Sequence, residues 1–186
     1  MERNLWAPWR MAYIRDLDQQ VASARVGVTT EGSGNFLLAA WKSPTQDQDN
    51  FVVHRDAHGL IMLNRYPYTN GHLLIALGDP RARLLEYSPD QRAAFWRLVD
   101  VATALVERTL QPQGVNIGVN QGRAGGAGLP EHVHAHTLPR WNGDTNFMAT
   151  VAGARVVPES LESIAHNFIG VLPEVLHSVV HAHIHG

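Results

Sequence analysis

The feature that most constrains the fold is a five-residue run in which histidine alternates with small apolar residues, His132-Val133-His134-Ala135-His136. Successive side chains of a β-strand point to opposite faces. A strand over this run therefore places three imidazoles on one face and Val133 and Ala135 on the other, against a hydrophobic core. The chain needs a sheet that buries one face here and presents histidines on the other.

Other segments supply the remaining strands of such a sheet. Pro67 and Asn70-Gly71 favour a turn that makes residues 60–77 a hairpin. The histidine strand is expected to stop at Pro139. Short links between strands favour antiparallel pairing. Five segments have strand length and an apolar or alternating pattern: residues 51–54, 60–64, 73–77, 114–120 and 132–138.

Two helices are expected. Ser88-Pro89 is a favourable helix start, apolar residues from Phe95 to Val106 recur at helical spacing, and Pro112 ends the helix. Residues 158–170 form a second, shorter helix, whereas residues 20–50 show little periodicity and are interpreted mostly as loop. The predicted fold class is α+β, with an antiparallel sheet of about five strands and a long helix packed on one side.

The composition of the chain limits the classes of function that it can have. The 186 residues are 45% hydrophobic and 17% charged, which indicates a globular chain, and the net charge of −2 gives no electrostatic argument for nucleic acid or anionic membranes. Since there is no cysteine, disulfides, thiol nucleophiles and cysteine-ligated zinc are excluded. The N-terminal residues lack the apolar core of a signal peptide, and no apolar stretch approaches the roughly 20 residues that span a bilayer. We expect a cytoplasmic protein.

Three interpretations of the histidine run compete. It could be a polar strand face without chemistry, a metal site, or a site of nucleophilic catalysis. The outer Cα atoms of a three-histidine strand lie about 13 Å apart, so one ion would not easily bind all three. Gly122, Gly125, Gly126 and Gly128 just upstream let backbone N–H groups approach an anion. Joined to the histidines, this loop favours a phosphate ester attacked by an imidazole.

At this point the sequence resembles the histidine triad (HIT) superfamily, whose signature is His-x-His-x-His followed by two apolar residues. Thr137 departs mildly from the apolar pattern. The resemblance covers roughly residues 1–170 and is strongest to the branch that contains bacterial diadenosine tetraphosphate phosphorylases. The segments that carry it are residues 5–11, 63–72, 116–122, 127–132 and 139–148.

The resemblance implies roles for individual residues. His134 matches the nucleophile that attacks the α-phosphorus, and His132 and His136 match its helpers around the phosphate and the bridging oxygen. Asn64 falls where the family contacts the ribose and phosphate, and His72 where a histidine orients the site. The other matching positions are Asn120, Gln121 and Gly128 on the phosphate loop, and Trp141, typical of the phosphorylase-like branch.

The function that the resemblance implies is cleavage of dinucleoside polyphosphates through a nucleotidyl-histidine intermediate, with orthophosphate as the expected second substrate. Hydrolysis of the same compounds or of nucleoside phosphoramidates is the alternative, and a nucleotide-binding module without turnover is the alternative from another class. No cofactor is required for the covalent step, although a divalent cation can accompany the nucleotide. The family also implies a homodimer that shares its sheet.

One feature departs clearly from the family. Many bacterial relatives carry Cys-x-x-Cys as part of a structural zinc site, but the matching stretch near residues 34–37 has no thiol, so no metal is expected.

Residues 171–186 are expected to be a partly mobile extension beyond a domain of residues 1–170. A second alternating run, His181-Ala-His183-Ile-His185, lacks a glycine loop and is interpreted as an incidental tail.

Overall fold

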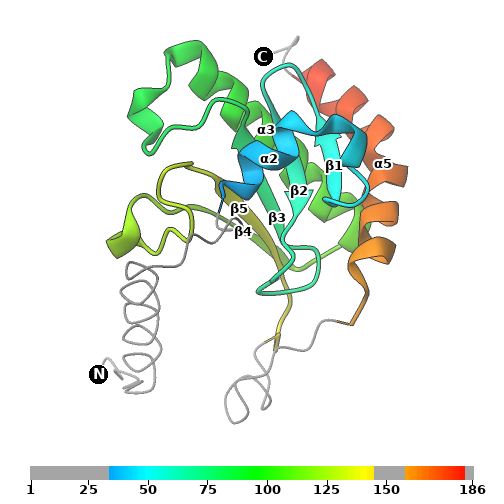
Figure 1. The fold of residues 1–186 in the computed structure, drawn as a ribbon. Coiled ribbons are helices and arrows are strands. Elements are labelled where there is room, and N and C mark those ends of the chain that lie inside the picture. Colours follow the sequence, from blue (N-terminus) through cyan, green and yellow to red (C-terminus); the bar gives the residue numbers. More distant parts are fainter. Residues whose placement is uncertain (1–33, 145–157, 183–186) are drawn as a thin grey trace, which may run out of the picture. The chain divides into compact units, whose positions relative to one another are not determined.

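The computed structural model describes residues 34–144 and 158–182. The arm expected for residues 1–14, most of the loop expected for residues 20–50, and His183 and His185 lie outside or largely outside the described residues. Within residues 34–144 and 158–182 the chain forms one sheet with helices on both faces (Figure 1).

The sheet has five strands in the order β1-β2-β3-β5-β4, and every neighbouring pair is antiparallel. The strands β2 and β3 are the two arms of the expected hairpin. The predicted α+β class with an antiparallel sheet is therefore confirmed. The strands are β1 (Val52–Arg55), β2 (Gly59–Leu63), β3 (Leu73–Leu77), β4 (Gly114–Val119) and β5 (Ala135–Arg140).

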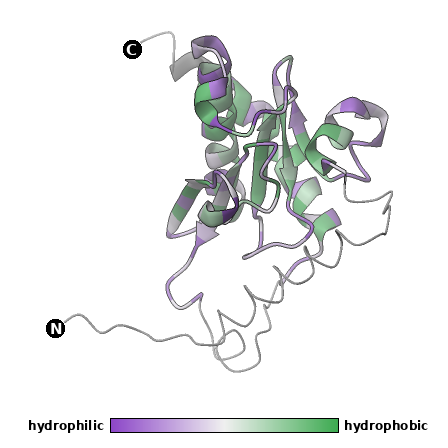
Figure 2. Ribbon diagram, turned by 60° about the vertical axis from the view of Figure 1, so that its left-hand side comes forward, coloured by the Kyte–Doolittle hydropathy of each residue, from purple (hydrophilic) through white to green (hydrophobic). Residues whose placement is uncertain are grey.

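Two long helices, α3 (Pro89–Leu110) and α5 (Leu161–Ala182), pack together and cover one face of the sheet. Val133 and Ala135 belong to the core cluster on that side. The short helix α2 (Phe36–Lys42) packs against the opposite face, over side chains such as Met62 and Leu74. Figure 2 shows the resulting pattern, in which the strands between the layers are mostly apolar.

Helix α3 starts and ends as its sequence predicts. The Ser88 hydroxyl accepts the Gln91 N–H, and the Gln91 side chain accepts the Ser88 N–H, so the two residues form a capping box. Gln111 adopts a left-handed conformation with φ 46° and closes the helix just before Pro112.

Helix α2 corrects the expectation of loop over the described part of residues 20–50. Asn35 caps it, because its side-chain oxygen accepts the Leu38 N–H at 2.9 Å. At the other end, the Arg55 guanidinium donates to the carbonyls of Ala40 and Trp41 at 2.9 Å. A seven-residue helix is too short to show a clear period, so its stability comes from these end contacts and its buried face.

The histidine strand also differs from expectation. It begins at Ala135, so that only His136 of the three histidines lies within it, and it continues through Pro139 to Arg140. β3 pairs with β5 only as far as Thr137, while β4 accompanies β5 to Arg140. Beyond Thr137 no described strand pairs with one edge of β5, and a residue without an N–H is tolerated at such an edge.

Helix α5 is longer than the predicted residues 158–170. It runs to Ala182 and includes Pro173. Val175 is fully buried, and Leu172 and Val179 pack against the core cluster, so the apolar face continues without a break at residue 170. No helix in the part of the chain that the structure describes is long and apolar enough to cross a membrane.

Candidate functional site

His134 lies at the centre of the candidate site and is held in one tautomer. Its Nδ1–H donates to the His132 carbonyl oxygen at 2.8 Å. A carbonyl only accepts, so the ring proton sits on Nδ1 and Nε2 keeps a free lone pair. Burial lowers the pKa of His134, partly offset by the hydrogen bond to His132, and the side chain is only 5% exposed. A neutral imidazole of this kind can act as a nucleophile.

His136 is oriented by a second histidine. The two rings meet through His72 Nε2 and His136 Nδ1, 2.9 Å apart. The Tyr68 backbone N–H donates to His72 Nδ1 at 3.2 Å, and the Asn64 amide nitrogen lies at the same distance. His72 must therefore carry its proton on Nε2 and donate it to His136. This leaves the ring proton of neutral His136 on Nε2.

Burial, and to a smaller extent the neighbouring His134, lower the pKa of His136 to about 4. The rings of His134 and His136 lie side by side, with centroids 4.9 Å apart. At neutral pH the site thus offers one bare imidazole nitrogen on His134 and one N–H donor on His136. This pairing suits attack at phosphorus with assistance to a departing oxygen.

His132 is fully buried and contacts two oxygens. Its Nε2–H donates to the Leu77 carbonyl at 2.8 Å, and its Nδ1 lies 3.0 Å from the Asn35 side-chain oxygen. Burial lowers the pKa of His132, whereas acceptors at both nitrogens favour the protonated ring. Both oxygens only accept, so both contacts are hydrogen bonds when each ring nitrogen carries a proton, whereas the neutral ring donates to one of them.

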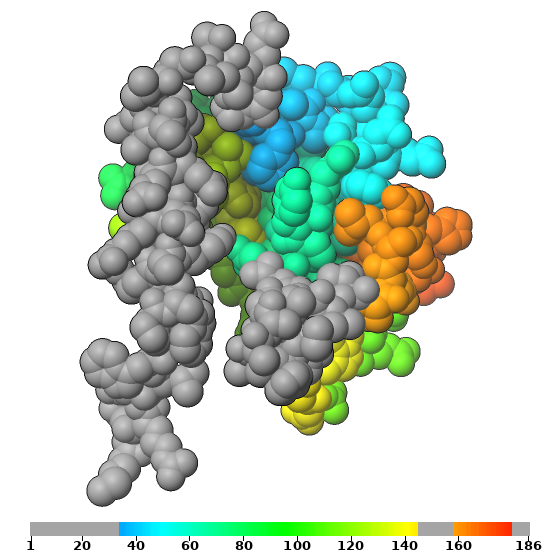
Figure 3. All heavy atoms as spheres, turned by 60° about the horizontal axis from the view of Figure 1, so that its bottom comes forward, coloured from blue at the N-terminus to red at the C-terminus, as the bar shows by residue number. Residues whose placement is uncertain are grey.

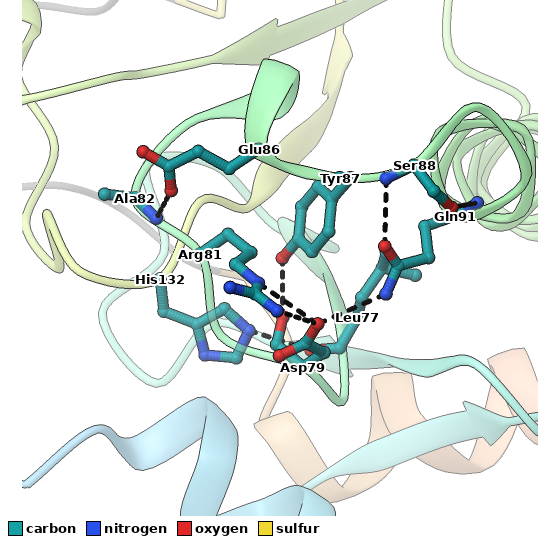
Figure 4. Close-up of polar contacts among 9 residues, drawn as sticks. All are labelled: Leu77, Asp79, Arg81, Ala82, Glu86, Tyr87, Ser88, Gln91 and His132. Atoms are coloured by element: carbon teal, nitrogen blue, oxygen red, sulfur yellow. Dashed lines mark hydrogen bonds and ion pairs between the residues drawn. The ribbon is translucent and has the colours of Figure 1, made fainter.

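The loop between β3 and α3 supports His132 (Figure 4). The Val133 N–H donates to the Arg81 carbonyl at 2.7 Å, so this loop runs beside the histidine segment. Asp79 accepts hydrogen bonds from the side chains of Arg81 and Gln91, and the Tyr87 hydroxyl donates to the Asp79 carbonyl. The capping box of α3 is therefore linked, through Asp79, to the residues that hold His132.

The predicted phosphate loop lies only partly beside the histidines. Val119 pairs with Ala135, so Asn120 follows at the level of His134, and its amide contacts the Gly126 carbonyl at 3.4 Å. The Gln121 side chain accepts the Leu84 N–H at 2.7 Å and thus anchors the β3–α3 loop. Gly128 is exposed.

Trp141 is not brought to the histidines within this chain. It follows β5 at the end away from His134 and lies five positions after His136, about 16 Å at the usual rise of a strand. The backbone N–H of Trp141 donates to the Asp144 carboxylate, which also forms an ion pair with Arg140.

Tyr68 is a site residue that the sequence reasoning missed. Its ring lies 4.8 Å from that of His72 and 6.2 Å from that of His136, nearly parallel to the latter, and is 53% exposed. Figure 3 shows the β2–β3 loop, which carries it, at the surface between α2 and α5. A tyrosine four residues before His72 in a turn was the available signal.

On the opposite face of β5, Thr137 is fully buried, and its hydroxyl has no hydrogen-bond partner among the described residues. This is the position where the family signature has an apolar residue. The departure noted in the sequence therefore affects the core rather than the row of histidines.

The residues at the position of the family's zinc site do not fit that metal. Asn35 and His132 meet there, but the asparagine oxygen is already engaged by helix α2 and no thiolate is available. Among residues 34–144 and 158–182, no group of three histidine or carboxylate side chains is arranged to hold a metal ion.

Comparison with known proteins agrees with this geometry. The family model of the HIT domain matches residues 45–143. The chain belongs to the HIT family. A Mycobacterium tuberculosis protein named AP-4-A phosphorylase is 31% identical over 160 residues, which are 86% of this chain and 78% of that protein. An uncharacterised HIT-like protein of Methanocaldococcus jannaschii is 36% identical over 93 residues, 50% of this chain and 70% of that protein.

Solved structures share the fold of this HIT domain. A zinc-bound histidine triad protein from Mycobacterium smegmatis superposes with a TM-score of 0.61 at 22% identity, covering 78% of this chain and 99% of that one. A histidine triad nucleotide-binding protein from Sulfolobus tokodaii gives 0.59 at 19% identity, covering 76% and 93%. The HIT-like fold expected from the sequence is thereby confirmed.

Proposed function

We propose that this HIT protein is an enzyme that cleaves dinucleoside polyphosphates, with diadenosine tetraphosphate as the first substrate to test, at an α-phosphate by phosphorolysis. The observation that carries the proposal is the tautomer of His134, which leaves Nε2 unprotonated inside a buried site. Membership of the HIT family and the 31% identity to a named AP-4-A phosphorylase support a nucleotidyl-transferring or hydrolysing enzyme.

The proposed reaction has two displacements at the same phosphorus. His134 Nε2 forms a bond to the α-phosphorus, and the bond to the bridging oxygen breaks, so that ATP leaves with the electron pair. His136 Nε2–H donates a hydrogen bond to that departing oxygen. An orthophosphate oxygen then attacks the phosphorus and releases His134, which yields ADP. Splitting the reaction in this way replaces one difficult step by two easier ones.

Supporting roles follow from the contacts. We propose that His72 and Asn64 position His136, because they fix its ring proton on Nε2. Asn120, Gln121 and Gly128 form the loop toward the phosphates, and Trp141 contributes from outside the row of histidines. No step of this chemistry requires a metal from the protein, and a divalent cation would arrive with the polyphosphate.

The decisive experiment incubates the protein with diadenosine tetraphosphate, with and without orthophosphate. ADP and ATP formed only when phosphate is present support phosphorolysis, and ³²P-labelled orthophosphate should appear in the β-position of ADP. AMP and ATP formed in water indicate a hydrolase instead. If neither set of products appears, the choice of substrate is wrong.

We also propose a homodimer formed along β4. Among residues 34–144 and 158–182 this strand ends the sheet, and it contains neither proline nor charge and exposes Ile117 by 48%. Such an unprotected edge is a template for pairing with a second strand. Light scattering should give twice the mass of the chain for the wild type and the mass of one chain for Ile117→Lys. A monomeric wild type would contradict the proposal.

A further inference from the structure

Asn35 makes two contacts that join residues far apart in the sequence. Its side-chain oxygen accepts the Leu38 N–H, which caps α2, and the same oxygen lies 3.0 Å from Nδ1 of His132, 97 residues later. The buried face of α2, including Leu37, holds the helix on the sheet. One amide thus fastens the start of α2 to the first histidine of the triad.

The backbone of His132 depends on such side-chain contacts. The histidine run before Ala135 lies outside β5, so no strand ladder holds it. Its described backbone contacts here are the N–H groups of His132 and Val133, which donate to turn and loop carbonyls. Side chains add further anchors: Val133 is buried in the core, and the His132 ring contacts the Leu77 carbonyl and, through a protonated Nδ1, the Asn35 oxygen.

The position of this backbone matters because the His132 carbonyl accepts the Nδ1–H of His134. If the carbonyl turns away, His134 loses the partner that keeps its proton on Nδ1. A neutral imidazole can carry its proton on either nitrogen, so without this acceptor the proton would distribute between both nitrogens. A fraction of the protein would carry the proton on the attacking nitrogen.

We propose that Asn35 is a positioning residue for His134, acting through the ring and then the carbonyl of His132. The kinetic part of this proposal rests on the proposed function, whereas the tautomer of His134 does not. Helix α2, which carries no histidine, thereby contributes to the state of the nucleophile.

Three substitutions at Asn35 separate helix capping from the contact with His132. Asn35→Ser keeps an N-cap oxygen but is one atom shorter, so it cannot also reach His132. Asn35→Asp keeps both contacts, and Asn35→Ala removes both. Arg55→Met is the matched control, because it loosens the other end of α2 without contacting His132.

The first measurement is kinetic, with diadenosine tetraphosphate and orthophosphate. Asn35→Ser should lower kcat about tenfold with KM unchanged, which corresponds to one lost hydrogen bond. Asn35→Asp should retain most of kcat, and Arg55→Met should retain it as well. Equal losses in the Ser and Asp variants, or the same loss in Arg55→Met, would overturn the proposal.

The second measurement needs no substrate. Two-bond ¹H–¹⁵N spectra of the imidazoles report which nitrogen of His134 is protonated, and His134→Gln assigns the signals. The wild type and Asn35→Asp should show the proton on Nδ1, whereas Asn35→Ser should show a mixture. An unchanged His134 tautomer in Asn35→Ser refutes the proposal even if the protein proves to cleave a different substrate.

Discussion

His132 and His136 stand at equal distances from His134 in the sequence, yet the fold holds them in different ways. His132 precedes the strand, is fully buried, and contacts a backbone carbonyl and an asparagine. His136 lies within β5, opposite Leu74 and Gly118, and contacts another imidazole, that of His72. The difference arises because β5 begins between them, at Ala135.

In the proposed reaction this difference gives the two residues different roles. The His132 backbone carbonyl accepts the Nδ1–H of the proposed nucleophile, His134, while the His132 ring contacts other parts of the protein. His136 has only one ring nitrogen occupied by His72, and the other carries a proton that can serve a substrate. In the proposed reaction, the three histidines of the motif therefore serve as an anchor, a nucleophile and a donor.

The largest effect is expected at the residue between them. His134→Ala should lower kcat for diadenosine tetraphosphate by roughly four orders of magnitude or more, because no other group can form the covalent intermediate. Mass spectrometry after rapid acid-free quenching should detect a nucleotidyl adduct on the wild type only. His183→Ala, in the C-terminal run, is the control, and a comparable loss there would contradict the assignment.

The two flanking histidines should respond differently to the leaving group. His136→Ala should lower kcat about a hundredfold with a nucleotide leaving group, and much less with an activated aryl ester of AMP, which needs no donor. His132→Ala should lower kcat by the same factor with both substrates. Steady-state rates on the two substrates test this, and an equal response of both variants would remove the distinction.

Substitutions of His72 test how the His136 ring is positioned, and their expected effect is smaller. His72→Ala should lower kcat about tenfold, since it releases the proton of His136 to either nitrogen without removing the donor itself. In His72→Gln the amide N–H can replace the lost donor, so this variant should recover part of the rate. If His72→Ala matches the wild type in kcat, His72 has no positioning role.

The buried rings also predict how stability depends on pH. The pKa of His136 is lowered by burial to about 4 from an ordinary value of 6.5, and the pKa of His134 is lowered by burial as well. The unfolded chain binds these protons first, so their stabilisation is complete above pH 6.5 and is lost as pH falls toward 4.

Urea unfolding of the wild type and His136→Gln at pH 7 and pH 5 checks this prediction. The wild type should lose more of its free energy of unfolding between these values, by on the order of 1 kcal/mol after allowance for solvent screening. If the free energy of unfolding changes by the same amount between pH 7 and pH 5 in both proteins, His136 keeps an ordinary pKa.

The smallest effect concerns the core side of β5. Thr137→Val should raise the free energy of unfolding by about 1 kcal/mol, because it replaces a buried hydroxyl that has no described partner with a methyl group. Activity should stay the same, since Thr137 points away from the histidines. A less stable Thr137→Val protein would mean that the hydroxyl has a partner after all.

Local sequence patterns predicted what depends on neighbours in the chain. The capping residues Ser88 and Gln91 define α3, and alternation in the histidine run predicts Val133 and Ala135 in the core. The hairpin of β2 and β3 follows from its apolar arms and its turn. In each case the information lies within a few residues.

The features of the fold and of the candidate site that were not predicted depend on contacts between residues far apart in the sequence. β5 begins at Ala135, where its pairing with Ile75 of β3 and Val119 of β4 starts, and the contact of Asn35 with His132 joins residues 97 positions apart. The helix expected for residues 158–170 continues past Pro173 to Ala182, because the face around Val175 is buried. The position of Tyr68 beside His136 follows from how the hairpin turn folds back on the sheet.

The hydrogen bond from the Tyr68 N–H to His72 has one more consequence. With that donor on Nδ1, His72 cannot take up a second proton there while it releases one from Nε2. The rings of His72 and His136 therefore cannot pass a proton toward the protein interior. In the proposed reaction, a proton that His136 passes to the departing nucleotide would therefore return from the substrate side, and the incoming orthophosphate can supply it.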